Sequence, residues 1–290
     1  MKVVHAPDDL EARPRAVALG TFDGVHLGHR RVLDAALAAG PGLVSTVVTF
    51  WPHPRTVLGN EVRLLTTLER RLELLAEAGV GETLVVEFTP ELARTEPAAF
   101  VDELLRPIGT ELVLAGANFR FGRGRSGDLG TLEHLGLAVE RIELVPGISS
   151  TAIRELLGGG EVESAARMLG RPAEVEGTVV SGDARGGTLG YPTANLRVAP
   201  DLLVPAYGIY AGWAAGHRAA ASIGTNPHYG GSERRIEAFL LDFEGDLYGE
   251  RLIVELWSRL RDERAFESEQ ELVAQITSDV EQTRTAERPI

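Results

Sequence analysis

The stretch Gly20–Arg30 (GTFDGVHLGHR) carries three glycines, two histidines and a carboxylate within a short span. It follows an apolar run and precedes a segment with the spacing of an amphipathic helix, so we expect it to join a strand to a helix. Glycines let the backbone approach a ligand closely, and the free N–H groups of a first helical turn attract anions. His26 and His29 lie on one face of that helix because they are three residues apart. The stretch predicts a site for nucleotide phosphates; the alternative is a tight turn with solvated histidines.

Three further loops follow predicted strands in the first half of the chain. Trp51–Arg55 (WPHPR) holds His53 between two prolines that fix the backbone. Asn118–Phe121 (NFRF) interleaves aromatic rings with an amide and a guanidinium, which suits a flat heteroaromatic with an anionic tail. Ser149–Arg154 (SSTAIR) places hydroxyls at a helix start and an arginine one turn later, which predicts a second phosphate clamp. The first loop also fits a rigid turn, and the last also fits a simple N-cap.

The second half has its own candidate site. Thr193 and Asn195 are two residues apart in an extended segment, so both side chains point the same way. A hydroxyl and an amide oxygen on one face suit a magnesium ion bound to nucleotide phosphates, and the glycine-rich loop 182–187 before them resembles a lid. Glu237 lies on a predicted strand face that is otherwise apolar, which favours a general base for a hydroxyl nucleophile. The alternatives are a plain hairpin and an edge-strand glutamate.

The elements that must position these residues differ between the two halves. In the first half, strands and helices alternate, which implies a parallel sheet with helices on both faces and ligands at the carboxyl ends of its strands. The predicted strands are 16–19, 43–50, 83–88, 111–115 and 138–145, and the predicted helices are 66–78, 97–105, 128–135 and 152–157.

After a helix over 161–169, Gly170–Pro172 predicts a domain boundary, with one domain over 1–172 and a second over 173–290. Short alternating runs in the second domain indicate an antiparallel barrel or sandwich. They are 175–181, 208–215, 219–223, 235–242 and 251–257. Ser268–Glu271 (SEQE) has the pattern of a capping box and predicts a C-terminal helix.

Composition limits the classes of function. The 290 residues are 44% apolar, enough for two cores, and the net charge of −13 argues against a general nucleic-acid binder. The chain has no cysteine, which excludes a thiolate metal site, and Lys2 is its only lysine, so phosphate charge must be met by Arg, His, backbone N–H or a metal ion. No segment has the pattern of a signal peptide or a membrane span, so we expect a cytoplasmic protein without a membrane partner. The oligomeric state stays open.

In their joint order these segments resemble the prokaryotic bifunctional riboflavin kinase/FAD synthetase family over essentially the whole chain. The marks in the first half are 20–30, 52–54 (PHP), 118–122 (NFRFG) and 149–154. Those in the second half are 189–196 (LGYPTANL), 207–211 (YGIYA), 223–227 (IGTNP), Glu237 with 241–242, 246–249 (DLYG) and 260–263 (LRDE). The resemblance implies an α/β nucleotidylyltransferase-type domain, acting as FMN adenylyltransferase, followed by a riboflavin kinase β-barrel with a C-terminal helix.

The resemblance also implies two reactions in series, from riboflavin to FMN and from FMN to FAD, each consuming ATP with Mg2+. Glu237 would take the hydroxyl proton beside Thr193 and Asn195, which would hold Mg-ATP, and His26 and His29 would stabilise triphosphate charge. The other implied nucleotide contacts are Gly20, Thr21, Phe22, Asp23, Gly28, Ser150, Thr151 and Arg154 in the first domain and Gly182, Gly190 and Pro192 in the second. The implied flavin contacts are His53, Asn118, Arg120 and Phe121 in the first domain and Arg261 and Glu263 in the second.

Two positions depart from the family pattern: His228 replaces a common threonine, and Gly187 stands where an arginine is common. Two other functions fit parts of the sequence. One is a different small-molecule adenylyltransferase with a non-catalytic barrel, against which Thr193, Asn195 and Glu237 argue. The other is a flavin-binding protein without activity, against which the intact histidine pair argues.

Overall fold

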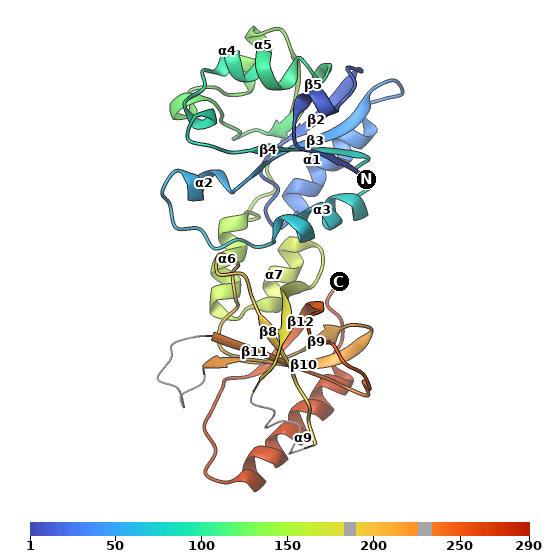
Figure 1. Ribbon diagram of the computed structural model, residues 1–290, viewed down its shortest axis with the longest axis vertical. Coiled ribbons are helices and arrows are strands. Elements are labelled where there is room, and N and C mark those ends of the chain that lie inside the picture. Colours follow the sequence, from blue (N-terminus) through green and yellow to red (C-terminus); the bar gives the residue numbers. More distant parts are fainter. Residues whose placement is uncertain (183–189, 226–233) are drawn as a thin grey trace. The chain divides into compact units, whose positions relative to one another are not determined.

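The computed structural model describes residues 1–182, 190–225 and 234–290, which form two compact units, unit 1 over Met1–Ser150 and unit 2 over Thr151–Ile290. Figure 1 shows a sheet covered by helices in unit 1 and a barrel in unit 2. Gly187 and His228, the two departures from the family pattern, lie outside the described residues.

Unit 1 is a parallel sheet whose strand order is β1-β4-β3-β2-β5-β6. The order reverses beside β2, because β3 and β4 lie on one side of it and β5 and β6 on the other. Ligands of open α/β sheets bind at the carboxyl ends of the strands at such a reversal. The strands are β1 Lys2–Val4, β2 Arg15–Leu19, β3 Val44–Trp51, β4 Glu82–Glu87, β5 Thr110–Gly116 and β6 Ala138–Ile142.

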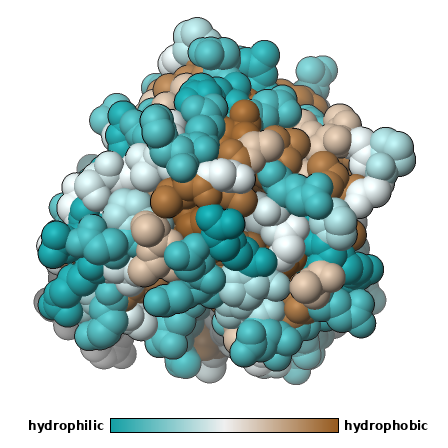
Figure 2. Space-filling view, turned by 90° about the horizontal axis from the view of Figure 1, so that it is seen from above, coloured by the Kyte–Doolittle hydropathy of each residue, from teal (hydrophilic) through white to brown (hydrophobic). Residues whose placement is uncertain are grey.

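Helices cover both faces of this sheet, as the sequence predicts. Ala16 and Ala18 of β2 pack into a core with residues of α1 and α3, whereas Val17 and Leu19 pack into a second core with residues of α4 and α5. A strand buried on both faces favours a continuous apolar sequence, which β2 has over Ala16–Leu19 after the buried Arg15. The helices are α1 Leu27–Ala38, α2 Pro54–Val57, α3 Leu68–Glu77, α4 Pro97–Phe100, which continues as a π-helical turn over Val101–Leu105, and α5 Leu129–His134. Figure 2 shows hydrophobic residues near the middle of one face with hydrophilic residues around them, and exposed apolar surface of this kind is ordinary for a folded protein.

Unit 2 contains a closed antiparallel barrel with the strand order β10-β11-β8-β7-β12-β9. Alternate residues point inward, so Ile236, Ala238 and Leu240 of β11 are buried and Glu237 and Phe239 are half-buried on the outer face. The strands are β7 Ala173–Val180, β8 Ala194–Arg197, β9 Gly208–Ala214, β10 His217–Thr225, β11 Arg234–Leu240 and β12 Arg251–Arg261. The helices are α6 Ser150–Gly159, α7 Val162–Leu169 and the C-terminal α9 Glu269–Thr285.

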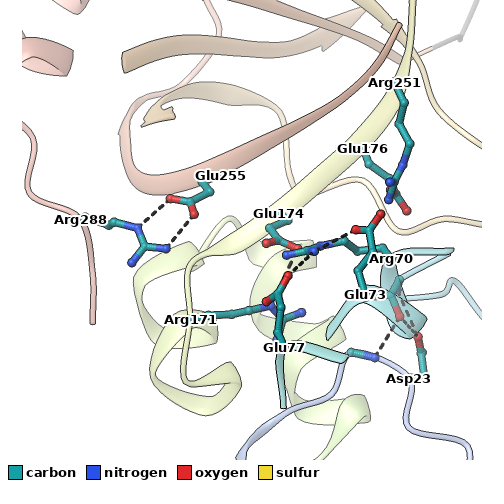
Figure 3. A network of polar contacts seen from close by, with 12 residues as sticks. Asp23, Arg70, Glu73, Glu77, Arg171, Glu174, Glu176, Arg251, Glu255 and Arg288 are labelled. Carbon is teal, nitrogen blue, oxygen red and sulfur yellow. Dashed lines mark hydrogen bonds and ion pairs between the residues drawn. The ribbon is translucent and has the colours of Figure 1, made fainter. Parts of the chain in front are cut away.

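Ion pairs fasten the outer surface of the barrel. Arg251 on β12 pairs with Glu176 on β7 at 2.5 Å, and Arg288 after α9 holds Glu255 on β12 through two hydrogen bonds of 2.8 and 2.9 Å (Figure 3). The C-terminal segment is therefore tied to the strand that pairs with both β7 and β9.

The predicted fold class is confirmed, but several local predictions are not. The sequence pattern does not predict β1 or β8, which have only three and four residues. The predicted capping box at Ser268–Glu271 is half formed: the Ser268 hydroxyl accepts from Glu271 N at 3.2 Å, but the Glu271 carboxylate accepts from Glu267 N at 3.3 Å. The final helix forms nonetheless, because the serine cap satisfies a first-turn donor.

The compact units divide after Ser150, whereas the sequence predicts a functional division after Pro172. Between these points, α7 packs against β7 and β12 of the barrel. The functional boundary therefore stays a prediction.

Candidate functional site

The loop after β2 has a backbone that few sequences could adopt. Phe22 and Val25 have φ of 54° and 38°, and Gly24 has φ of 83°. A Cβ at Gly24 would lie 2.7 Å from Leu65 Cδ1, so glycine is required there for space as well as for its backbone angle. Non-glycine residues with positive φ are costly and persist where the surrounding structure holds them. The loop is therefore a fixed, strained turn and not a flexible connection.

The buried side chain of Asp23 fixes this loop through hydrogen bonds. It is 2% exposed and accepts from Leu65 N at 3.0 Å, from Thr66 N at 3.2 Å and from the Thr66 hydroxyl at 3.3 Å. Gly24 N in turn donates to the same hydroxyl at 3.2 Å. Asp23, a predicted nucleotide contact, thus joins the loop to the segment that leads into α3. The backbone of Thr21 is fixed in a similar way, because its carbonyl accepts from the Thr49 hydroxyl of β3 at 2.9 Å.

The two histidines face one another at the start of α1. Their rings are stacked, with centroids 3.6 Å apart, and the Phe22 ring meets His29 edge-on at 5.3 Å. His26 is the N-cap of α1, and its Nδ1 accepts from His29 N at 3.3 Å. A Cβ at Gly28 would lie 3.1 Å from the His26 ring, so this position favours a residue without a side chain.

His29 is uncharged at neutral pH. Burial, the neighbouring His26 and the Arg71 guanidinium hold the pKa of His29 well below its usual value. Its Nδ1 is buried and has no hydrogen-bond partner in the described part of the chain. A neutral imidazole donates through one ring nitrogen only. His29 can thus offer a phosphate one N–H group, and its charge would follow only if a bound anion raised the pKa.

Ser150, the first residue of α6, lies against the same loop: its hydroxyl donates to the Asp23 carbonyl at 3.1 Å. The predicted contacts Thr151 and Arg154 occupy the first turns of the same helix. The Ser150 hydroxyl therefore lies against the strained loop, and the phosphate clamp over Ser150, Thr151 and Arg154 stays a prediction.

The predicted flavin contacts of unit 1 divide into two kinds. His53 is buried and caps α2, with its Nδ1 accepting from Arg55 N at 3.2 Å. Phe121 is also buried, because its ring packs against Phe100 at 5.0 Å. Asn118 and Arg120 are exposed. Asn118 and Arg120 can contact a ligand directly, whereas His53 and Phe121 shape the loops that carry such contacts.

In unit 2 the structure brings Thr193, Asn195 and Glu237 together. Asn195 on β8 pairs directly with Glu237 on β11, so both side chains leave the same outer face of the barrel. The Thr193 hydroxyl donates to Glu237 Oε2 at 3.2 Å. Gly182 lies against this group, because a Cβ there would be 2.2 Å from Asn195 Nδ2. The site thus combines a hydroxyl, an amide and a carboxylate beside a backbone segment without a side chain.

A cavity of about 150 Å³ with both apolar and polar walls adjoins Thr193. Its walls come from the barrel strands and from the turn after β11. They are Val179, Pro192, Thr193, Ala194, Ala238, Leu240, Phe243, Gly245, Asp246, Leu247 and Tyr248. Such a volume is smaller than a typical pocket for a whole nucleotide and suits one flat ring system.

Of the predicted flavin contacts of the barrel, Arg261 is the last residue of β12 and Glu263 follows it by two residues. The Arg261 guanidinium forks onto the buried Asp279 carboxylate of α9 at 2.7 to 3.1 Å. Glu263 is exposed, and its carboxylate lies over Gly224, where a Cβ would be 2.1 Å from Oε1. Arg261 therefore fixes the segment to α9, and Glu263 is the better placed of the two to reach a ligand. Gly190, another predicted contact, is exposed with φ of 86°.

Comparisons with known proteins place both sites in one family. A family model for FAD synthetase matches residues 8–152, and one for riboflavin kinase matches residues 169–286. A relative from Listeria monocytogenes, named bifunctional riboflavin kinase/FMN adenylyltransferase, is 38% identical over 93% of this chain and 91% of its own length. The chain belongs to the bifunctional riboflavin kinase/FMN adenylyltransferase family. A relative of the same name from Bacillus subtilis is 35% identical over 96% of each chain.

A solved structure has the same fold over nearly its whole length. It is described as a macrolide-efflux protein from Streptococcus pneumoniae, is 30% identical, covers 98% of this chain and 99% of its own, and has a TM-score of 0.88. That description names export, whereas both family models matched within this chain name enzymes of flavin metabolism. In the part of the chain that the structure describes, no helix has the length and apolar character needed to cross a membrane.

Two features of the candidate sites were not predicted from the sequence. The cavity wall contributed by Phe243 and Tyr248 was not assigned to a site. Its signal in the sequence is Tyr248 within 246–249, one of the segments that resemble the family. The buried Arg71 beside His29 was also missed. Its signal is an arginine on the apolar stripe of a helix, three residues after Leu68 and four before Leu75.

Proposed function

We propose that residues 1–172 of this bifunctional enzyme carry the FMN adenylyltransferase reaction and residues 173–290 the riboflavin kinase reaction. The FAD synthetase model ends at residue 152 and the riboflavin kinase model begins at residue 169, which supports this division. The observation that carries the proposal is that each unit holds its own set of converging polar groups, around His26 and His29 in one and around Glu237 in the other.

In the kinase reaction, the riboflavin 5′-hydroxyl attacks the γ-phosphorus of ATP, the bond from that phosphorus to the bridging oxygen breaks, and FMN and ADP leave. Glu237 accepts the hydroxyl proton, and the hydrogen bond from Thr193 holds the carboxylate in one orientation. The cavity beside Thr193 takes the adenine ring. Glu263, which is exposed, takes the flavin side.

The residues at this site fit Mg2+ bound to ATP. Thr193 and Asn195 offer oxygen atoms, which Mg2+ prefers, and Mg2+ usually keeps few protein ligands when it binds with substrate phosphates. We assign Thr193 and Asn195 to hold Mg2+, which neutralises phosphate charge when bound.

In the adenylyltransferase reaction, an FMN phosphate oxygen attacks the α-phosphorus of a second ATP, and pyrophosphate leaves as FAD forms. The attacking oxygen is already anionic, so no covalent intermediate on the enzyme is needed. His29 donates its N–H to a phosphate oxygen, and the N-termini of α1 and α6 receive the remaining charge. Asn118 and Arg120, which are exposed, take the flavin side.

The partners that this proposal requires are small molecules: riboflavin, FMN and ATP. A cytoplasmic location fits both reactions, because each consumes ATP. The net charge of −13 supports the view that nucleic acid is not a partner.

The proposal is tested by incubating the protein with ATP, Mg2+ and either riboflavin or FMN and separating the flavins by chromatography. We expect riboflavin to give FMN and then FAD, and supplied FMN to give FAD directly. If the protein formed FAD from supplied FMN but no FMN from riboflavin, only the adenylyltransferase activity would be supported and the kinase activity would be excluded. If neither flavin changed, the function of a binding protein would replace that of an enzyme.

A substitution at Gly182 tests the kinase site separately. In Gly182→Ala the new Cβ would meet Asn195 Nδ2 at 2.2 Å and displace the amide that we assign to Mg-ATP. We expect the KM for ATP in riboflavin phosphorylation to rise about tenfold, the effect of losing roughly 1.4 kcal/mol of binding. Gly158→Ala is the matched control, because nothing lies within 4 Å of a Cβ at that position of α6. An unchanged KM in Gly182→Ala would contradict the role of Asn195.

A further inference from the structure

Arg71 is a buried cation for which neither reaction described above has a use. It lies on α3, its side chain has 0% exposure, and it shares the buried stripe of that helix with Leu74 and Leu75. Taking a guanidinium out of water is costly unless it is paired and hydrogen-bonded. A leucine at this position would cover the sheet at lower cost. The charge at Arg71 therefore calls for an explanation beyond packing.

The guanidinium of Arg71 spans two loops at the carboxyl ends of neighbouring strands. One terminal nitrogen lies 3.7 Å from Asp23 Oδ1, in the strained loop after β2. The other donates to the Phe50 carbonyl near the end of β3 at 3.4 Å, and the carbon of the guanidinium lies 5.4 Å from the centre of the Trp51 ring. Trp51 leads directly into the turn that carries His53. Arg71 therefore touches both the loop assigned to ATP and the strand that leads to the flavin side.

Arg71 also contributes to the charge environment of His29. The His26 ring stacks on this imidazole at 3.6 Å, the Phe22 ring meets it edge-on, and the buried positive charge of Arg71 lowers the pKa of His29. The Asp23 carboxylate, whose negative charge would favour a proton on His29, is instead engaged by two backbone N–H groups and by Arg71. Arg71 and the donors to Asp23 thus act in the same direction, against protonation of His29.

We propose that Arg71 is a positioning residue for adenylyl transfer: it fixes the nucleotide loop against the end of β3 and places a permanent positive charge beside His29. This inference rests on the proposed adenylyltransferase function of unit 1. Arg71 touches neither substrate; it acts through Asp23, Trp51 and His29. A helix residue far from the loop in sequence thereby sets both the geometry and the protonation of the group that meets ATP.

The test compares Arg71→Met with Arg70→Met in the full-length enzyme. Arg70 is the next residue of the same helix, but its guanidinium pairs with Glu73 and Glu77 at 2.9 Å each (Figure 3), so its loss removes a charge without touching the loop. For Arg71→Met we expect kcat for FAD formation from FMN to fall about 100-fold, as when a reacting group is misplaced by about 1 Å. We also expect the pKa of His29, followed by NMR of its ring protons, to rise by about one unit. Arg70→Met should change neither.

Arg71→Lys tests the same role if Arg71→Met fails to fold. Lysine retains the charge but not the fork that reaches both loops, so we expect the wild-type titration of His29 together with a reduced kcat. In a profile of kcat/KM against pH, the apparent pKa on the acid side should be higher in Arg71→Met than in the other variants. Ionisations of ATP and FMN do not affect this comparison because they are the same for all variants. A folded Arg71→Met with wild-type kcat and an unmoved His29 titration would overturn the inference. Failure of the wild-type enzyme to make FAD from FMN would instead overturn the proposed function.

Discussion

Glu237→Gln is expected to stop FMN formation from riboflavin while FAD formation from supplied FMN continues at the wild-type rate. The amide has nearly the shape of the carboxylate but cannot accept the hydroxyl proton, and a general base contributes about 10²- to 10⁴-fold to a rate. The Thr193 hydroxyl can still donate to the amide oxygen, so the neighbouring Mg-ATP ligands keep their places. The measurement is kcat for each step, with riboflavin or FMN as the flavin substrate.

Two comparisons make the result for Glu237 specific. Glu281→Gln removes an exposed carboxylate on α9 and should leave both rates unchanged. ATP binding to Glu237→Gln should stay within a few-fold of wild type, which separates loss of chemistry from loss of the site. If Glu237→Gln phosphorylated riboflavin at the wild-type rate, Glu237 would not be the group that accepts the proton of the riboflavin hydroxyl. If both steps fell together in a folded variant, the assignment of two separate sites would be wrong.

Glu237 shows what alternation in a sequence can predict. Ile236, Ala238 and Leu240 are apolar and alternate with Glu237, so a barrel strand must turn the carboxylate outward, and the structure confirms this. The same reasoning places Thr193 and Asn195 on one face. The pairing of Asn195 with Glu237 was not predictable in this way, because register between strands far apart in sequence depends on the closure of the barrel.

The loop after β2 shows more clearly what the sequence could not predict. Three glycines and two histidines predict a phosphate site, but they do not say that Asp23 would be buried. Its donors, Leu65 and Thr66, lie more than forty residues away and come close only through packing of α3 on the sheet. From the sequence alone, Asp23 is therefore predicted to contact the ligand, whereas in the structure its carboxylate accepts hydrogen bonds from within the protein.

His29→Ala is expected to reduce FAD formation from FMN by about 10²- to 10³-fold, the effect of removing one preorganised donor to developing phosphate charge. Riboflavin phosphorylation should be unchanged, because it is assigned to the other unit. His134→Ala is the matched control: this histidine also belongs to unit 1, but it is exposed at the end of α5. Normal FAD synthesis by a folded His29→Ala enzyme would rule out the imidazole as a phosphate donor.

The wild-type enzyme and His29→Ala should differ in how their stability changes with pH. The pKa of His29 is lowered in the folded state by burial, His26 and Arg71, whereas in the unfolded chain it is about 6.5. Between these two values the unfolded chain binds more protons, so the contribution of neutral His29 to the free energy of unfolding is complete above about pH 6.5 and declines as pH falls toward the folded pKa. Wild-type stability should thus decrease more than that of His29→Ala from pH 7 to pH 5 in urea unfolding followed by fluorescence. A difference between the two proteins that stayed constant with pH would mean that the pKa of His29 is the same in the folded and the unfolded chain, which would contradict the lowered pKa.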